Sequence, residues 1–237
     1  IRLSLVGSEM CIRDRTRDAQ DQVAALSHQH AAAAQAAGVF DDEIVPVAVP
    51  QRRGEPVLVT ADEGIRPDTT VESLAGLRAA FADGGSITAG NSSQISDGAS
   101  AVVVTTRGTA EAKGWPVLVT VGASGQTAGP DNSLQAQPAR AIERACEKQG
   151  IAPADLDVVE INEAFGAVVA RSQVELGLSS DVVNIHGGGI AIGHPIGASG
   201  TRLVVHVAHE LARRGSGTAA VGLCGGGGQG EALILTR

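Results

Sequence analysis

The stretch DVVEINEAFGAVVARSQVELG, residues 157–177, changes its hydrophobic pattern partway along. Its first part, DVVEI, is a short apolar run rich in β-branched residues, which predicts a buried strand. The rest, residues 162–177, carries apolar side chains at helical spacing and predicts a helix that stops at Gly177. A buried strand that leads directly into a helix is the building unit of an α/β layered fold.

The same alternation continues on both sides of this unit. Strands are predicted at 117–123, 157–161, 182–184, 218–224 and 231–236, and helices at 137–150, 162–177 and 197–215. The order β-α-β-α-β-α-β-β predicts an α/β layered domain in which the last two strands form a hairpin.

The residues before Trp115 follow a less regular pattern. They predict an alanine-rich helix from an N-cap at Thr16 to Gly38, followed by a hairpin of the apolar runs 43–49 and 56–60. An exposed loop at 62–70 and a short helix at 71–81 come next. A glycine- and serine-rich turn then leads into a predicted buried strand at 101–106.

The composition is that of a globular chain. Of its 237 residues 43% are hydrophobic, enough to bury a core, and 26 acidic against 18 basic residues give a formal net charge of −8. The acidic excess disfavours nucleic acid as a partner. Because no apolar run approaches the roughly 18 residues that cross a bilayer and no secretory leader opens the chain, we expect a cytoplasmic protein with no membrane partner.

The cysteines and the first fifteen residues bear on possible disulfides and metal sites and on where the native sequence begins. Cys11, Cys146 and Cys224 are odd in number and widely spaced, which argues against a disulfide framework and a C-x-x-C metal pair, so we expect no metal. Cys146 lies in a predicted helix and is interpreted as packing. The opening IRLSLVGSEMCIRDR differs in character from the rest and is similar to translated adapter sequence, so residues 1–15 are interpreted as a non-native leader.

The run LCGGGGQG, residues 223–230, matches the dinucleotide-binding pattern G-x-G-x-x-G. That pattern binds a pyrophosphate at the N-terminus of a following helix, whereas a strand is predicted to follow here. A nucleotide-binding protein is therefore the weakest functional alternative. The sequence contains neither GxxxxGK[ST] nor G-x-S-x-G, which argues against phosphate-loop NTPases and serine hydrolases.

Polar residues follow predicted strand ends at NEAF (162–165), at GGGIAIGHPIGASG (187–200) and at LCGGGGQG. Active sites of α/β folds form where strands end. Taken singly, Asn162 is typical of a helix N-cap, His194 of a turn, and Cys224 of a small buried hydrophobe. Together, in this order, they favour a catalytic site.

These three motifs, with AGNSSQISDGA and RPDTT in support, resemble the thiolase family, and within it the acetyl-CoA C-acetyltransferases, from about Thr16 to Arg237. The resemblance implies a thiolase-like layered fold. It implies an acyltransferase that joins two acetyl-CoA molecules, or cleaves a 3-ketoacyl-CoA with CoA, through an acyl-cysteine. It also implies acyl-CoA and CoA as partners, no separate cofactor because these thioesters are substrates, and a homodimer or homotetramer.

The resemblance assigns roles to the motif residues. Cys224 would be the base that takes a proton from the thioester methyl group and returns it in cleavage, and we expect a thiolate there near neutral pH. His194 would activate the nucleophilic cysteine and, with a water held by Asn162, bind the thioester oxygen as it gains charge. The backbone N–H of Gly226 would serve a second oxyanion hole.

Less specific matches concern substrate binding. Contacts to CoA or to the acyl pocket are implied for Arg66, Ser73, Ala89, Ser93, Leu134 and Phe165. Each has a plainer interpretation, as a surface polar residue or as part of the core. The remaining histidines are interpreted structurally, His206 and His209 as a helix face and His28 and His30 as solvent-facing, while His186 receives no role.

One part of the family pattern has no match. The family's nucleophilic cysteine lies in its N-terminal half, and Cys11 does not fit that motif. The chain therefore resembles a C-terminal portion of a thiolase, with 16–82 as the remainder of the loop domain, 83–112 as the last strands of the N-terminal domain and 113–237 as a complete C-terminal domain. We expect such a chain to be inactive alone, and a non-catalytic CoA-binding module is the main alternative.

Overall fold

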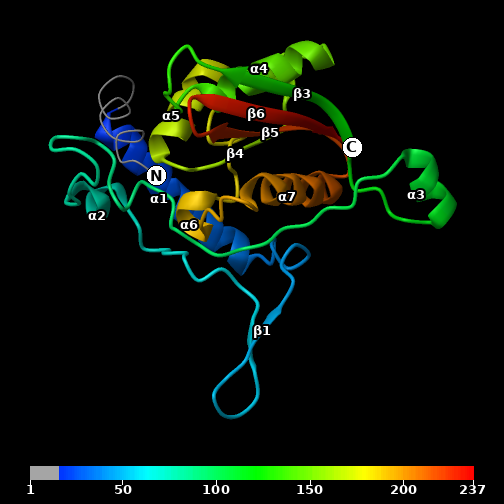
Figure 1. Ribbon diagram of the computed structural model, residues 1–237, viewed down its shortest axis with the longest axis horizontal. Coiled ribbons are helices and arrows are strands. Elements are labelled where there is room, and N and C mark those ends of the chain that lie inside the picture. The colour runs from blue at the N-terminus through cyan, green and yellow to red at the C-terminus, as the bar shows by residue number, and fades with distance from the viewer. Residues whose placement is uncertain (1–15) are drawn as a thin grey trace.

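The computed structural model describes residues 16–237, which form a four-stranded sheet, a separate two-stranded hairpin and the helices around them (Figure 1). The sheet has the order β3-β6-β5-β4, with β3 at Thr120–Ala128, β4 at Val158–Ile161, β5 at Thr218–Gly225 and β6 at Gln229–Thr236. Helices α4 (Gln137–Gln149) and α5 (Gly166–Leu176) cover one face and α7 (Ser199–Arg214) covers the other. The α/β layered fold predicted from the alternating pattern is confirmed.

Strand β4 shows how the two helical layers share one sheet. Val159 and Ile161 pack into the core beneath α4 and α5, whereas Val158 packs against α7. All three are fully buried. A strand that is covered on both faces needs apolar side chains facing both ways, and the two valines and the isoleucine of β4 meet this need. Glu160, the one charged residue of β4, is also buried and pairs with Arg202 of α7 at 3.4 Å.

The strand pairing confirms most of the predicted order and corrects its details. β4 runs parallel to β5, β5 turns back into β6 as an antiparallel hairpin, and β3 pairs antiparallel with the other side of β6. The strand predicted at 182–184 is only an isolated bridge between Val159 and Val183. Helix α5 begins at Gly166, so NEAF is the turn before the helix and not its first turn.

Helix α1 (Arg17–Ala36) begins at the predicted cap, where the Thr16 hydroxyl accepts the Ala19 N–H, and it ends shortly before Gly38, which has a φ of 72°. It packs against α5 and against the short helix α6 (Gly189–Ile192). Helix α1 therefore supports the glycine-rich segment that precedes His194. None of the helices within residues 16–237 has the length and hydropathy needed to cross a membrane.

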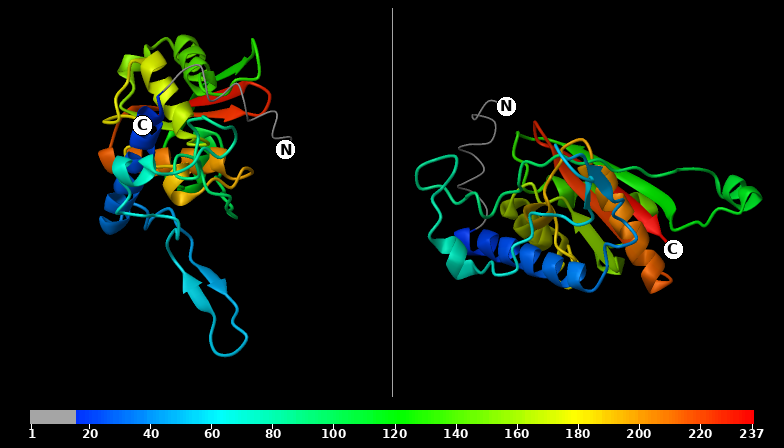
Figure 2. Two further views of the ribbon diagram at one scale, coloured as in Figure 1. Left: turned by 90° about the vertical axis from the view of Figure 1, so that its left-hand side faces the viewer. Right: turned by 90° about the horizontal axis from the view of Figure 1, so that it is seen from below.

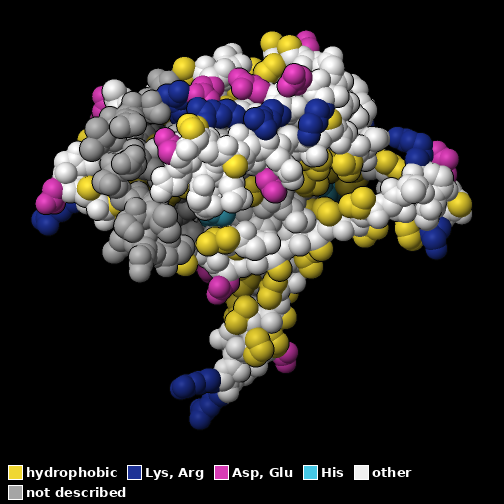
Figure 3. Space-filling view, turned by 45° about the horizontal axis from the view of Figure 1, so that its top comes forward, with side chains coloured by type: hydrophobic (Ala, Val, Ile, Leu, Met, Phe, Trp, Pro, Cys, Tyr) yellow, Lys and Arg dark blue, Asp and Glu magenta, His cyan; other side chains and the backbone are white. Residues whose placement is uncertain are grey.

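The predicted hairpin is present as β1 (Val47–Val49) and β2 (Val57–Val59), which pair antiparallel, and helix α2 (Val71–Ala75) follows it. The hairpin projects away from the body of the molecule (Figure 2). Hydrophobic side chains lie along its length in the space-filling view (Figure 3), and Val47 and Leu58 are each 59% exposed.

The buried strand predicted at 101–106 is wrong. The structure has no strand between residues 83 and 112, and helix α3 (Arg107–Lys113), which the sequence pattern did not predict, follows directly. Val103 and Val104 are 83% and 75% exposed. A strand persists only where a neighbouring strand accepts its backbone hydrogen bonds, and no strand of residues 16–237 pairs with this segment.

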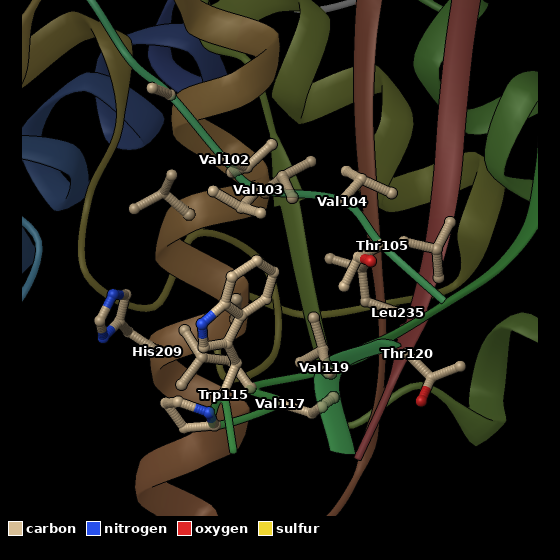
Figure 4. Close-up of a pocket in the computed structure, with 18 of the residues that line it drawn as sticks. Val102, Val103, Val104, Thr105, Trp115, Val117, Val119, Thr120, His209 and Leu235 are labelled. Carbon is tan, nitrogen blue, oxygen red and sulfur yellow. The ribbon is translucent and has the colours of Figure 1, made fainter. Parts of the chain in front are cut away.

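Residues 102–104 instead border an apolar pocket of about 710 Å³ (Figure 4). Its other walls come from Trp115, from residues 117–121 and from the exposed side of α7 at His209. Neither His194 nor Cys224 lines this pocket. It is therefore separate from the site described below.

A hydrogen-bonded cluster ties the segment after α1 to helix α7. His206 is 2% exposed, and its Nδ1 lies 2.9 Å from a carboxylate oxygen of Glu43, while its Nε2 lies 3.1 Å from Nδ1 of His186. His206 thus has a structural function, as interpreted from the sequence. Within residues 16–237 no group of His, Cys, Asp or Glu side chains is arranged to hold a metal ion.

The cluster predicts a pH-dependent stability. Burial, followed by the neighbouring His206, lowers the pKa of His186 from 6.5 to about 4. The unfolded chain therefore binds this proton more readily, so His186 contributes stability that is complete above pH 6.5 and is lost as the pH falls toward 4. We expect a loss of about 2 kcal/mol between pH 7 and pH 5 from this residue, measured by urea unfolding.

Replacing His186 with glutamine removes the titrating group and should reduce this pH dependence. His209→Gln, on α7 but outside the hydrogen-bonded cluster, is the control and should retain it. An equal loss of stability in wild type and His186→Gln between pH 7 and pH 5 would contradict the assignment.

Candidate active site

The site lies at the carboxyl ends of the two parallel strands. The backbone N–H of Asn162 donates to the Gly222 carbonyl oxygen at 2.9 Å, one residue beyond the last residue of β4. Cys224 lies two residues further along β5. Both residues are thus on the sheet edge where α/β folds place ligands, as the sequence predicts.

His194 comes from the loop between α6 and α7 and meets Asn162 there. The amide Nδ2 of Asn162 lies 3.2 Å from Nε2 of His194. The His194 backbone N–H donates to the Gln94 carbonyl oxygen at 3.2 Å, and Gly193, with a φ of 96°, makes the turn that allows this. The structure therefore brings together two residues that lie in separate sequence motifs.

Glu163 anchors the turn that carries Asn162, and the sequence analysis assigned it no role. Its carboxylate accepts the Ser27 hydroxyl at 2.5 Å, the Ile190 N–H at 3.1 Å and the Asn184 side-chain amide at 2.9 Å. It is 1% exposed, and burial raises its pKa despite these donors. One carboxylate thus joins α1, α6 and the segment after α5 to the turn.

The electrostatic surroundings keep His194 neutral. Burial lowers its pKa, and the positive charge of Arg202 on α7 lowers it further. The side-chain oxygen Oδ1 of Asn162 is buried and has no hydrogen-bond partner in the described chain. An amide oxygen only accepts hydrogen bonds, so this buried atom without a partner suits the binding of a water molecule that donates to it.

The ionisation state of Cys224 differs from the one predicted from the sequence. It is partly buried on β5 against the core beneath α4, and burial raises its pKa to about 11. The thiolate expected near neutral pH is therefore wrong for the isolated chain, because the backbone hydrogen bond that favours the thiolate does not offset its desolvation. Cys146 is 1% exposed in the core, as predicted, and burial also raises its pKa.

The reactivity of Cys224 tests this ionisation state. Alkylation consumes the thiolate, so its rate should rise about tenfold per pH unit from pH 7 to pH 9 without levelling off. Peptide mass spectrometry after iodoacetamide pulses measures it, with buried Cys146 as the internal control that stays unlabelled in the folded chain. A rate that levels off by pH 8 would show an ionised Cys224 and contradict the raised pKa.

Gly226 lies at the exposed turn between β5 and β6, and an added Cβ there would meet no atom within 4 Å. The residue is exposed, and there is open space where a side chain would project. The glycine run as a whole is a hairpin turn followed by strand β6. The helix that a dinucleotide-binding loop needs does not follow it, in agreement with the sequence analysis.

One predicted binding residue, Phe165, lies in the turn 162–165, and another, Ser93, lies beside it. The Ser93 hydroxyl donates to the Ala164 carbonyl oxygen at 3.2 Å, and Phe165 stacks edge to face on Phe81 with ring centres 6.0 Å apart. Gln94, next to Ser93, donates to the carbonyl oxygens of Gly64 and Ile190 and so ties the loop at 62–70 to α6. No role for Gln94 follows from the sequence motifs.

The other predicted binding residues are more peripheral. Ser73 forms a capping box with Thr70 in the first turn of α2, and both it and Ala89 are exposed. Leu134 is partly buried just before α4. No hydrogen bond or contact that the structure shows joins any of these three to His194 or Cys224.

The loop of Arg66 rests on helix α1 through a histidine. The Arg66 backbone N–H donates to Nδ1 of His28 at 3.1 Å, which leaves the Arg66 side chain exposed. His28 is 4% exposed, and Nδ1 of His30 lies 3.3 Å from the Asn184 carbonyl oxygen. The prediction that these histidines face solvent is wrong, because the loop and residues near 184 cover that side of α1.

Comparison with known proteins finds family models that match the N-terminal and the C-terminal parts of the chain. The family model of the thiolase N-terminal domain matches residues 11–108, and that of the thiolase C-terminal domain matches residues 115–237. The first match begins within the presumed leader at Cys11, which lies outside the described residues.

Curated relatives are similar over nearly all of this chain. It is 58% identical to a protein of Mycolicibacterium smegmatis named "Probable acetyl-CoA acetyltransferase", over 94% of this chain and 57% of the relative. It is 48% identical to the acetyl-CoA acetyltransferase of Pseudomonas aeruginosa, over 94% of this chain and 56% of the relative. The chain thus spans about half the length of the curated relatives it matches.

Solved structures of similar proteins also match nearly all of this chain and about half of their own length. The acetyl-CoA acetyltransferase of Bacillus anthracis superposes with a TM-score of 0.89 at 41% identity, covering 93% of this chain and 56% of that one. Human mitochondrial 3-ketoacyl-CoA thiolase, crystallised with CoA, superposes with a TM-score of 0.87 at 37% identity, covering 94% and 55%.

Proposed function

The chain belongs to the thiolase family, and on this basis we propose that it supplies the proton-transfer and oxyanion-binding half of a thiolase active site. The reaction is acyl transfer between CoA thioesters, either condensation of two acetyl-CoA molecules or cleavage of a 3-ketoacyl-CoA by CoA. The names of the relatives support this reaction class. CoA thioesters are the substrates, and the proposal requires no separate cofactor.

The observation that carries the proposal is the contact between Asn162 and His194 at the sheet edge that also holds Cys224. Enolate chemistry needs a donor for the thioester oxygen and a group that exchanges a proton with the adjacent carbon. The unpartnered Oδ1 of Asn162 can hold the water that donates to this oxygen. Gly226, with open space beside it, offers a backbone N–H for the second oxygen.

The raised pKa of Cys224 fits one direction of the reaction directly. In cleavage, the nucleophilic cysteine that the proposal assigns to the other half of the site bonds to the 3-keto carbon, and the carbon–carbon bond breaks to leave an acyl-cysteine and an acetyl-CoA enolate. The enolate then takes the S–H proton of Cys224, which becomes a thiolate. In condensation the same thiolate takes a methyl proton from acetyl-CoA. A resting thiol with a pKa of about 11 is therefore poised for cleavage and must first lose its proton for condensation.

The chain alone is expected to form no acyl-enzyme. Of the cysteines within residues 16–237, Cys146 is buried in the core and Cys224 has the proton-transfer role. The purified chain should therefore release no CoA from acetyl-CoA above the rate in buffer, followed with a thiol reagent. Release of CoA that disappears in Cys224→Ala would contradict this inactivity.

Binding tests the proposed function in the chain itself. Acetyl-CoA is titrated into protein labelled with ¹⁵N in histidine rings and ¹³C at cysteine Cβ, and NMR signals are followed. We expect the signals of His194 and Cys224 to shift along one saturation curve, while those of His209 and Cys146 remain unchanged. Saturable binding that moves neither His194 nor Cys224 would instead favour a CoA-binding module that uses another surface.

Other parts of the proposal concern the wider protein. Arg66, Ser73, Ala89, Ser93, Leu134 and Phe165 are proposed to contact CoA or the acyl group, and Ser93 and Phe165 have the best support because they adjoin the turn of Asn162. We propose loop-domain, N-terminal and C-terminal portions at 16–82, 83–112 and 113–237. A homodimer or homotetramer in the cytoplasm is proposed on the family resemblance alone.

A further inference from the structure

Ser199 lies in the first turn of α7 and is within reach of the imidazole of His194. Its hydroxyl oxygen is 2.6 Å from Nδ1 of His194 and 2.9 Å from the carbonyl oxygen of Pro195. Ser199 is 1% exposed, so the chain itself, rather than bulk water, supplies these partners. The sequence motifs include Ser199 but give it no role.

These two contacts alone leave two places for the single hydroxyl hydrogen, because the Pro195 carbonyl oxygen already accepts the backbone N–H groups of Ala198 and Ser199 and Nδ1 of His194 is also in reach. The other side of the ring decides between them. The side-chain amide Nδ2 of Asn162 can only donate, and it lies 3.2 Å from Nε2 of His194, so Nε2 accepts. The proton of the ring is then on Nδ1, which donates to the Ser199 oxygen, while the hydroxyl hydrogen points to Pro195.

The charge state of the ring is consistent with this assignment. Burial and the charge of Arg202 lower the pKa of His194, so the ring is neutral near pH 7 and carries one proton, on Nδ1. Its Nε2 has a free lone pair, toward which the side-chain amide of Asn162 donates at 3.2 Å. This assignment uses the orientation of the Asn162 amide in the structure, in which Nδ2 faces the ring and Oδ1 is the buried atom without a partner.

We propose that Ser199 is a positioning residue that fixes His194 in the Nδ1–H tautomer and keeps its Nε2 free to accept a proton. The catalytic value of this tautomer rests on the proposed function. A thiol that is activated by His194 gives its proton to Nε2, which leaves a thiolate and an imidazolium whose Nδ1–H still donates to Ser199. With the proton on Nε2 instead, the neutral ring would offer that thiol no acceptor.

The test is the tautomer of His194, read from two-bond ¹H–¹⁵N NMR spectra of the chain labelled with ¹⁵N in its histidine rings, without acyl-CoA. Wild type should show a protonated Nδ1 and an unprotonated Nε2 near neutral pH. Ser199→Ala should lose this single state and show a substantial Nε2–H population. It should also lower the pKa of His194 further, because the charged ring loses an acceptor for its Nδ1–H.

Ser172→Ala is the matched control, since Ser172 is a fully buried serine of α5 whose hydroxyl donates to the Gln135 carbonyl oxygen, away from His194. It should leave the His194 tautomer unchanged. An Nε2–H tautomer in wild type would overturn the proposal even if Ser199→Ala failed to fold, and an unchanged tautomer in a folded Ser199→Ala would also overturn it. Because no substrate is added, a chain that fails to bind acetyl-CoA would contradict the proposed function and leave this result standing.

Discussion

Replacing Gly125 with alanine is expected to prevent the chain from folding stably, with a loss of about 3 kcal/mol or more in the free energy of unfolding. Gly125 lies on β3 where helix α4 crosses it. A Cβ there would overlap the Ala141 carbonyl oxygen and lie 2.7 Å from the Ala145 backbone nitrogen. Both atoms are helix backbone, so only a separation of α4 from the sheet could make room.

Urea unfolding followed by circular dichroism measures this loss, with Gly108→Ala as the matched control. Gly108 lies in helix α3, and an added Cβ would meet no atom within 4 Å. The control should be neutral or slightly stabilising, because alanine favours a helix over glycine. If Gly125→Ala unfolds at the same urea concentration as wild type, the contact between β3 and α4 is described wrongly.

Removing the carboxylate of Glu163 should be the next most damaging change. Glu163→Ala leaves the Ser27 hydroxyl, the Ile190 N–H and the Asn184 amide without their acceptor. A buried donor without a partner costs about 1–3 kcal/mol, so we expect a total loss of at least about 3 kcal/mol. The contact between Asn162 and His194 should be lost in the same variant, because the turn that carries Asn162 loses its anchor.

Two further variants separate this role from a general effect of charge. Glu163→Gln keeps the shape and one acceptor oxygen, so it should lose less stability than Glu163→Ala. Glu175→Ala removes a carboxylate that is paired with Arg171 on the surface of α5, and it should cost at most about 1 kcal/mol. Equal losses in Glu163→Ala and Glu175→Ala, measured by urea unfolding, would refute the anchoring role.

The sequence predicted the C-terminal layers well because their pattern reflects local physics. Runs such as 158–161 direct apolar side chains to both faces of the sheet, and glycines such as Gly150 and Gly177 end helices in the left-handed conformation. The run 101–106 has the same apolar character, yet it forms no strand. Whether this run forms a strand depends on a partner strand beside it, and the residues of the run do not reveal whether such a partner is present.

The candidate site was predictable in its membership but not in its electrostatics. Motif order placed Asn162 and His194 together, and the structure shows them in contact. The ionisation of Cys224 was not predictable, since a pKa is set by burial and by neighbours that come from distant parts of the chain. Glu163 and Ser199 were missed for the same reason, because their partners become visible only in three dimensions.

The central claim is that this chain supplies the proton-transfer half of a thiolase site, and a chimera tests it most directly. The part of the Mycolicibacterium smegmatis relative that the match leaves uncovered is joined to residues 16–237, and thiolysis of acetoacetyl-CoA is measured. We expect activity that falls by roughly 100-fold or more in Cys224→Ala and in His194→Ala, but not in Cys146→Ala. An active chimera that keeps its kcat in both Cys224→Ala and His194→Ala, or a folded chimera without thiolysis, would contradict the account.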